Sequence, residues 1–359
     1  MPYLAVRPEA VSGQCPSIRP ASPPRASGER GRALRAWLVA ALLAFGAGLP
    51  GAHAQGAPEP IRVVATFSIL ADMVREVGGD RIALQTIVGP NGDAHAFEPA
   101  PRDARALGQA RLLVRNGLGF EGWLPRLLEA SGFKGLDVVA SEGVRPRILN
   151  GEEQAREAGE HGGHGAGGRG GAGHGGHEGV DHVGDIDPHA WQDLSNGVIY
   201  VRNIARGLAA ADPAHADEYR LRAQAYAARL REEDRAWRAS LAAIPPAHRV
   251  MMSSHDAFGY LGRAYGIELI SVLGLSSEAE PAAGTIARLV DRIRARGIHA
   301  VFLEKAVNPT LMQRIVQETG ARIGGTLYSD TLDAPGTPAG TYLGMFRWNA
   351  QHILEGLRG

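Results

Sequence analysis

Short apolar segments rich in β-branched residues alternate along the chain with amphipathic patterns of helical period. The apolar segments predict strands at residues 62–66, 82–88, 111–115 and 136–139, separated by helices at 69–77, 102–110 and 122–130. The alternation repeats with strands at 248–253, 267–272, 300–304 and 321–327, and helices at 257–265, 282–296 and 311–319. Since such alternation favours parallel sheets with crossover helices, we predict an α/β fold of two lobes, each with a parallel sheet and flanking helices. The lobes are expected at residues 55–211 and 245–359.

One long helix is predicted between the lobes, over residues 212–244. Asp212 is a favourable N-cap, Pro213 suits a first helical turn, and Pro245 with Pro246 ends the pattern. Apolar residues recur at roughly helical spacing, at Tyr219, Ala223, Tyr226, Leu230, Ala236, Trp237 and Leu241. A helix of this length spans roughly 45 Å, so we expect a rigid connection that runs along both lobes.

Residues 1–54 have the pattern of a secretory signal peptide that is removed from the mature protein. A basic segment from Glu29 to Arg35 precedes an apolar run from Trp37 to Leu49, and Ala52-His-Ala54 resembles a cleavage site. The apolar run is shorter than the ~20 residues that span a bilayer. A retained membrane anchor is the alternative.

Composition narrows the chemistry of the mature chain. The only cysteine of the full sequence, Cys15, lies in the segment predicted to be removed, so the mature chain has none. Cys15 does not follow an apolar run, which argues against a lipid-anchored cysteine. Any metal site must therefore use His, Asp and Glu side chains. Without residues 1–54 the chain has 32 basic and 36 acidic residues, a net charge of −4, so we expect no nucleic-acid partner.

A Gly- and His-rich segment occupies residues 152–186. It contains five of the chain's 13 histidines, His161, His164, His174, His177 and His182. Tracts of this composition indicate metal binding, and the segment lacks the apolar groups that would order it. We predict a disordered accessory loop that gathers or senses metal more weakly than a folded site; a passive spacer is the alternative.

Four residues with metal-binding side chains occur near the ends of predicted strands. His95, His255 and Asp330 follow strands, and His189 follows the His-rich segment. Ligands of open α/β sheets bind beyond the carboxyl ends of the strands, so two lobes would bring two such ends face to face. Three imidazoles and one carboxylate suit tetrahedral zinc and leave no position for a reactive water. We predict a site that binds and releases metal without catalysis.

Two further polar residues, Asn116 and Glu304, also end predicted strands. A histidine that binds metal needs a hydrogen-bond partner for its second ring nitrogen, and these residues are candidates for that role. Helix capping or turn formation is the alternative for both.

Four short motifs surround the candidate ligands, at residues 91–99, 187–193, 254–260 and 327–332. Their order and residues, such as Asp187-Pro-His189-Ala-Trp191, resemble those of the periplasmic zinc/manganese-binding proteins of ABC importers, over essentially the whole mature chain. The resemblance implies a bilobal periplasmic protein that captures metal between its lobes and delivers it to a membrane permease with its ATPase. We expect it to act as a monomer.

The resemblance favours Zn²⁺ as the cargo, with Mn²⁺ or iron as alternatives. A His-rich loop ahead of the second ligand and a histidine at position 255 are typical of zinc-specific members, whereas Tyr328-Ser-Asp330 resembles the manganese or mixed-metal branch.

Two other classes, a secreted zinc metalloenzyme and a metal-binding adhesin, stay open from the residues alone. We expect no enzyme, because catalytic zinc needs an open coordination position and neither His-Glu-x-x-His nor Gly-x-Ser-x-Gly occurs in the sequence.

Overall fold

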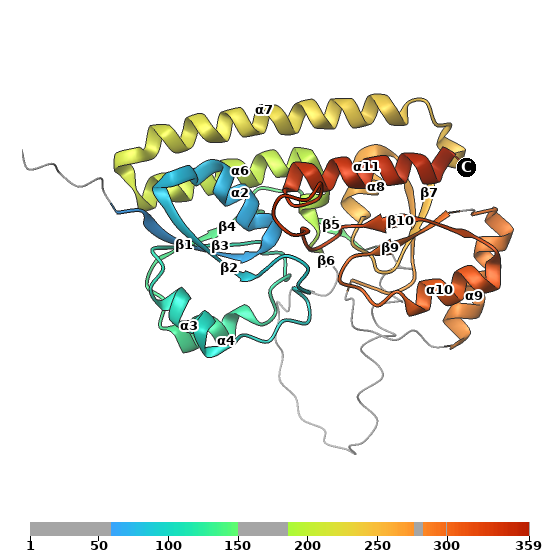
Figure 1. Ribbon diagram of the computed structural model, residues 1–359, viewed down its shortest axis with the longest axis horizontal. Coiled ribbons are helices and arrows are strands. Elements are labelled where there is room, and N and C mark those ends of the chain that lie inside the picture. The colour runs from blue at the N-terminus through green and yellow to red at the C-terminus, as the bar shows by residue number, and fades with distance from the viewer. Residues whose placement is uncertain (1–58, 150–185, 276–282, 299, 359) are drawn as a thin grey trace, which may run out of the picture. The chain divides into compact units, whose positions relative to one another are not determined.

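The computed structural model describes residues 59–149, 186–275, 283–298 and 300–358. The predicted signal peptide and the five histidines of the His-rich segment lie outside these residues. The chain from Glu59 to Gly359 forms one compact unit, shown in Figure 1.

The first lobe contains a four-stranded parallel sheet in the order β2-β1-β3-β4. Its helices connect successive strands (Figure 1). The elements in chain order are β1 (Ile61–Phe67), α2 (Ser68–Gly78), η1 (Gly79–Arg81), β2 (Ile82–Val88), α3 (Pro101–Gly108), β3 (Leu112–Arg115), α4 (Leu124–Ser131) and β4 (Leu136–Val139).

The second lobe contains another four-stranded parallel sheet, in the order β10-β9-β7-β8. In both lobes the first strand lies between the second and the third, and the fourth lies beyond the third. The elements are η6 (Pro246–His248), β7 (Val250–Ser253), α8 (Gly259–Tyr265), β8 (Glu268–Ser271), α9 (Ala283–Arg296), β9 (Ala300–Glu304), α10 (Thr310–Thr319), β10 (Arg322–Leu327) and α11 (Tyr342–Arg358). This strand order confirms the predicted pair of α/β lobes, and it points the carboxyl ends of both sheets toward the candidate ligands.

The predicted strands and helices of both lobes are present, with ends that differ by no more than two residues. The linking helix is shorter than predicted. Residues Pro213–His215 form a 3-10 turn, η5, and α7 (Ala216–Leu241) then runs for 26 residues. The Asp212 carboxylate accepts a hydrogen bond from the Tyr219 hydroxyl and contacts the ring of His215, so it anchors the turn before the helix.

Helix α6 (Leu194–Ala211) was not predicted, because its Val and Ile residues and two glycines weaken the helical pattern. The Asp193 carboxylate caps its start by accepting from the Ser195 amide at 2.8 Å. A Cβ at Gly207 would lie 2.4 Å from Val138, so glycine allows α6 to pack closely on β4. Packing on the sheet therefore outweighs weak helix propensity here.

Helix α11 was also missed, although its buried residues recur at helical spacing at Leu343, Phe346, Ala350 and Ile353. This periodicity would have been sufficient to find it. The short antiparallel pair β5 (Arg147–Ile148) and β6 (Ile186–Asp187) has no comparable signal, since each strand has two residues.

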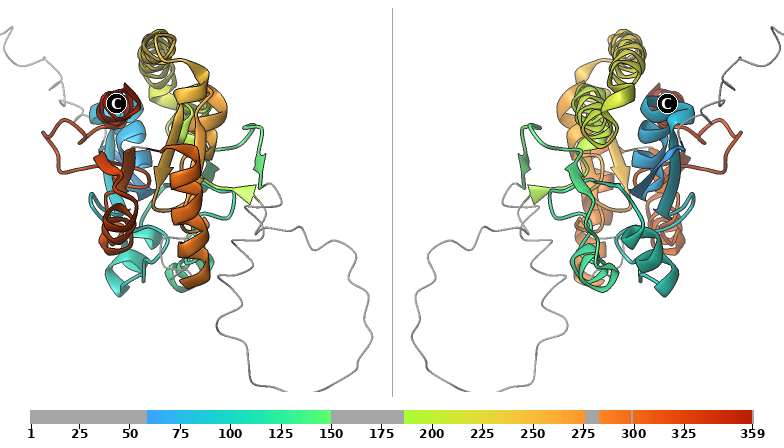
Figure 2. Two further views of the ribbon diagram at one scale, coloured as in Figure 1. Left: turned by 90° about the vertical axis from the view of Figure 1, so that its right-hand side faces the viewer. Right: turned by 90° about the vertical axis from the view of Figure 1, so that its left-hand side faces the viewer.

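Helix α7 crosses both lobes and joins them through a common core. It contacts α2 and α6 of the first half and α11 of the second, and the side views of Figure 2 show it at the top of both lobes. One cluster of buried apolar residues extends from β1 through α6 and α7 to α11, while a smaller cluster lies among β7, β9, α9 and α10. Wide separation of the lobes would expose this shared core to water, which is unfavourable.

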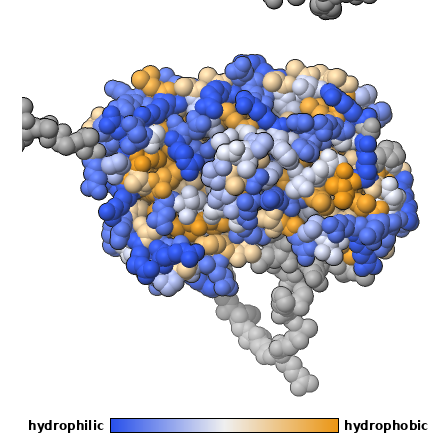
Figure 3. Space-filling model, in the orientation of Figure 1, coloured by the Kyte–Doolittle hydropathy of each residue, from blue (hydrophilic) through white to orange (hydrophobic). Residues whose placement is uncertain are grey.

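The surface is mixed in polarity. On the face shown in Figure 3, apolar residues occur in small patches among hydrophilic ones. No helix in the described part of the chain combines the length and apolar character needed to cross a membrane.

The α7 core provides a test of the shared packing. Leu230 is fully buried, so Leu230→Ala should lower the free energy of unfolding by about 2–5 kcal/mol through lost burial and a residual cavity. Leu221 on the same helix is 65% exposed, and Leu221→Ala should change it by less than about 0.5 kcal/mol. Urea unfolding of the metal-free chain measures both; equal effects would contradict the assigned packing.

Candidate metal centre

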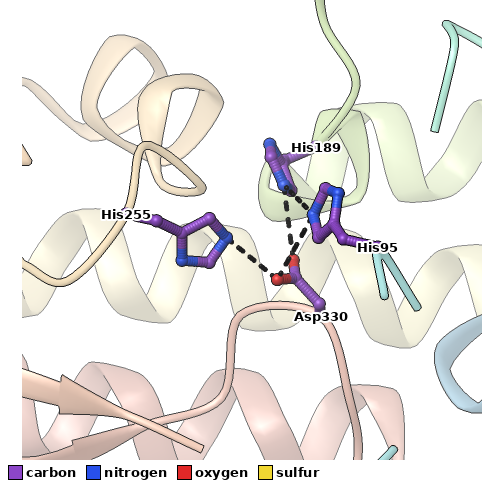
Figure 4. Close-up of side chains that lie close together, drawn as sticks. All are labelled: His95, His189, His255 and Asp330. Atoms are coloured by element: carbon purple, nitrogen blue, oxygen red, sulfur yellow. Dashed lines mark hydrogen bonds and ion pairs between the residues drawn. The ribbon is translucent and has the colours of Figure 1, made fainter. Parts of the chain in front are cut away.

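Four side chains from separate loops converge between the lobes, as Figure 4 shows: His95, His189, His255 and Asp330. One donor atom of each lies within 4.8 Å of the others. The Nε2 atoms of His95 and His189 are 3.2 Å apart, and Nε2 of His255 lies 2.9 Å from Asp330 Oδ2. Asp330 Oδ1 lies 3.5 Å from Nε2 of His189. The structure thus brings together all four predicted candidates, two from each lobe.

His95 lies on the loop that follows β2. The Asp93 carboxylate accepts a hydrogen bond from the His95 amide at 2.8 Å, which closes a tight local turn. The Trp123 indole donates to the Ala94 carbonyl at 2.9 Å and holds the same turn from α4. These contacts direct the His95 ring toward the other lobe.

His189 follows β6, and one carboxylate oxygen of Asp187 fixes its position. Asp187 Oδ1 accepts from the His189 amide at 2.9 Å and lies 2.8 Å from its Nδ1. This contact selects the tautomer with a proton on Nδ1 and leaves the lone pair of Nε2 free to bind a metal ion. The role predicted for Asn116 therefore belongs to Asp187, which the sequence pattern did not single out.

Asn116 acts one step further away, which corrects its predicted contact with a histidine ring. Its side-chain NH₂ group donates to the carbonyls of Gly117 and Pro188, both at 2.9 Å, and its side-chain oxygen accepts from the Tyr200 hydroxyl. The buried carboxylate of Glu121 accepts a hydrogen bond from the backbone N–H of Asn116 at 2.6 Å. Asn116 thus holds the backbone immediately before His189.

His255 follows β7 and is placed by Glu304 at the end of the adjacent strand β9. Glu304 Oε1 accepts from the His255 amide at 2.9 Å, and Oε2 lies 2.7 Å from the ring Nδ1. Glu304 therefore occupies the position predicted for a partner of the second ring nitrogen. Because β7 and β9 are neighbours in the sheet, strand order alone brings the two residues together.

Asp330 lies after β10 on a loop that accepts hydrogen bonds from the other lobe. The side chains of Trp191 and Gln192 both donate to the Ser329 carbonyl, at 2.8 and 2.6 Å. These donors follow His189 in the chain, so one segment positions its own histidine and the carboxylate opposite. The Tyr342 hydroxyl in turn donates to the Trp191 carbonyl.

Aromatic rings enclose the first-lobe side of the cluster. Phe120 packs edge-on against His95 and lies 4.8 Å from Trp191, which itself contacts His189. Phe67 completes this wall. Such a wall excludes water, and a less polar surrounding strengthens electrostatic interactions at the four donor atoms.

Burial and charge set opposite protonation preferences within the cluster. Burial lowers the pKa of His95 to about 4. Burial also disfavours a charged His255, but the carboxylates of Glu304 and Asp330 outweigh it and raise the pKa of His255 well above its usual range. Burial disfavours an ionised Asp330, but His255 and His189 outweigh it and hold the pKa of Asp330 well below its usual range. The neighbouring carboxylates therefore favour the protonated form of His255, whereas burial favours the neutral form of His95.

The donor set fits a divalent cation. Asp330 Oδ1 is buried and accepts no hydrogen bond from any residue that the structure describes, although a buried carboxylate oxygen is costly without a partner. Imidazole nitrogens and a carboxylate oxygen are ligands of zinc and related transition metals. A cation among these atoms would supply the missing partner.

Comparison with known proteins agrees with this geometry. Residues 63–356 match the family described as zinc-uptake complex component A, periplasmic. The chain belongs to this family. The predicted resemblance to periplasmic metal-binding proteins of ABC importers is thereby confirmed, and the family consists of substrate-binding proteins of metal ABC transporters rather than enzymes.

The names of similar proteins give different metals. The chain is 31% identical to the metal ABC transporter substrate-binding lipoprotein FimA of Streptococcus parasanguinis, over 84% of this chain and 91% of FimA. It is 32% identical to the manganese-binding lipoprotein MntA of Halalkalibacterium halodurans, over 89% of this chain and 96% of MntA. The solved structure of the periplasmic zinc binding protein TroA from Treponema pallidum matches with a TM-score of 0.71 and 27% identity, over 83% of this chain and 99% of TroA. Family membership therefore establishes a divalent metal without choosing between zinc and manganese.

The protonation pattern can be measured in the metal-free protein. The His255 ring should carry both protons at neutral pH, and the His95 ring should stay neutral until the pH falls to about 4. Glu304→Gln should lower the pKa of His255, because it removes the charge beside Nδ1, whereas Glu318→Gln on the exposed end of α10 should not. Imidazole ¹⁵N NMR reports each ring, and a neutral wild-type His255 at pH 7 would refute the assignment.

Proposed function

We propose that the protein captures Zn²⁺ between its lobes through His95, His189, His255 and Asp330. The convergence of these four buried donors is the observation that carries the proposal. Each imidazole presents Nε2 to the common centre, and the carboxylate of Asp330 approaches them all. Four protein ligands satisfy zinc without a water, which suits a cargo site.

The choice of zinc rests on the nature of the donors. Manganese prefers carboxylate, carbonyl and water oxygens in octahedral geometry, whereas three imidazoles and one carboxylate suit zinc. Nitrogen ligands also bind Zn²⁺ more tightly than Mn²⁺. Mn²⁺ is the first alternative cargo, because the relative MntA is named as a manganese-binding lipoprotein, and iron is a second alternative.

Uptake and release follow from the charges in the site. Zn²⁺ replaces the proton on His255 and neutralises Asp330, so binding releases a proton and weakens as the pH falls. The loaded protein then delivers the metal to an ABC transporter permease, powered by its ATPase, as the family membership supports. It acts in the periplasm as a monomer after its signal peptide is removed.

Membrane attachment is not part of the proposal. The names of FimA and MntA include the word lipoprotein. In this chain the only cysteine, Cys15, precedes the apolar segment of residues 37–49 instead of following it. That order does not fit a lipid-modified cysteine at a cleavage site.

Metal competition tests the proposal. Zn²⁺ should outcompete Mn²⁺ for the metal-stripped mature chain on the order of 100-fold or more, about 2.8 kcal/mol, because imidazoles supply three of the four ligands. His255→Glu should reduce this preference, whereas His248→Glu at an exposed site of the same lobe should not. Competition followed by elemental analysis measures both, and a wild-type preference for Mn²⁺ at neutral pH would overturn zinc as the cargo.

The His-rich segment provides a separate test. We propose that its histidines, which lie outside the described residues, gather or sense zinc but do not form the tight site. Deletion of residues 152–183 should leave the tight zinc affinity within about twofold, since none of the four ligands is removed, and should abolish additional weak binding. Calorimetric titration distinguishes the two classes of site; loss of the tight class on deletion would contradict this division.

A further inference from the structure

Arg147 is a positively charged residue between the two lobes that the metal-binding proposal does not use. It lies in β5, which pairs with β6 directly ahead of His189. Its side chain is only 14% exposed, although an arginine guanidinium is costly to bury without partners. Its partners therefore indicate what it does.

The first contact of Arg147 is with the first lobe. Its Nη1 donates to Asp187 Oδ2 at 3.0 Å, and the other oxygen of Asp187 contacts the amide and Nδ1 of His189. Asp187 is fully buried, so its negative charge needs a countercharge. Arg147 provides it, and it also holds in place the carboxylate that contacts the His189 amide and ring.

The second contact is with the other lobe. Nη2 of Arg147 forms an ion pair of 3.9 Å with Asp256, the residue after His255. The Arg147 amide donates to the Tyr260 hydroxyl at 2.9 Å, which docks the strand on α8. The guanidinium also lies against Gly259, where a Cβ would come within 2.3 Å of Arg147 Cζ. Only glycine leaves room for it there.

We propose that Arg147 is a positioning residue that couples the two lobes at the metal, so that it slows metal release. One planar guanidinium joins the carboxylate behind His189 to the loop of His255, and these histidines belong to different lobes. Release of the metal must break its bonds to both of these histidines. By holding both against the same group, Arg147 opposes their separation. The inference rests on the proposed metal cargo.

Stopped-flow release of Zn²⁺ to a chelator tests this role. Arg147→Met removes the charge at similar length and should raise the dissociation rate by about 10- to 100-fold, the usual effect of losing a group that orients a ligand. The association rate should change by less than about twofold, since steering depends on the field of the whole protein. Arg147→Lys should give an intermediate rate, because an ammonium lacks the planar fork that reaches two carboxylates.

Gly259→Ala displaces the same guanidinium without changing any charge. The atom it would contact is the end of a flexible side chain, so the fold can accommodate the methyl group while the contact is lost. It should accelerate release in the same direction as Arg147→Met, and the double variant should release no faster than Arg147→Met alone. This variant decides the question if Arg147→Met fails to fold, which circular dichroism of the metal-free chain reports.

Arg81→Met is the matched control, because Arg81 forms a similar 2.9 Å pair with Glu218 at the amino end of β2, opposite the end that leads to His95. Its release rate should equal that of the wild type. Wild-type release rates in Arg147→Met and Gly259→Ala, or an equal acceleration in Arg81→Met, would overturn the role of Arg147 and leave the cargo proposal intact. A wild-type chain that binds no zinc would overturn both.

Discussion

Balance of buried charge is the constraint on which the centre of this protein depends. Three carboxylates, Asp187, Glu304 and Asp330, are buried, and buried negative charge needs positive partners within the protein. Arg147 balances Asp187, and His255, whose pKa is raised, lies between Glu304 and Asp330. The metal-free centre is thus a compact set of ion pairs. The Nε2 atom of His255 must be unprotonated to bind a metal ion, so metal binding depends on the pH of the surroundings.

The architecture serves this constraint by fixing loops from both lobes. Each sheet contributes residues from the carboxyl ends of neighbouring strands, as in other open α/β folds. The apolar core that continues through α6, α7 and α11 then prevents the lobes from separating without exposing buried surface. The loop that carries Asp330 is also held from the other lobe, by the Trp191 and Gln192 side chains.

Much of the fold followed from periodicity, because strands buried in a parallel sheet and amphipathic crossover helices have strong local patterns. Helix α6 did not, since its glycines and β-branched residues are helical only through the Asp193 cap and close packing on β4. Three of the candidate ligands could be found from their places after predicted strands, and the fourth, His189, from its motif behind the His-rich segment. The partner of His189 could not, because both Asp187 and Asn116 can accept a hydrogen bond from an imidazole, and only the fold places Asp187 against the ring.

The pairing of β5 with β6 has a consequence for how the chain can change over evolution. Ile148 and Ile186 are adjacent across this pair, so the two ends of the segment that connects these strands are held next to each other. The entropy of closing a loop rises only slowly with its length. Segments of very different length and composition can therefore be exchanged here at little thermodynamic cost. The position is a natural point for grafting new sequence beside the centre, such as a reporter whose signal follows metal occupancy.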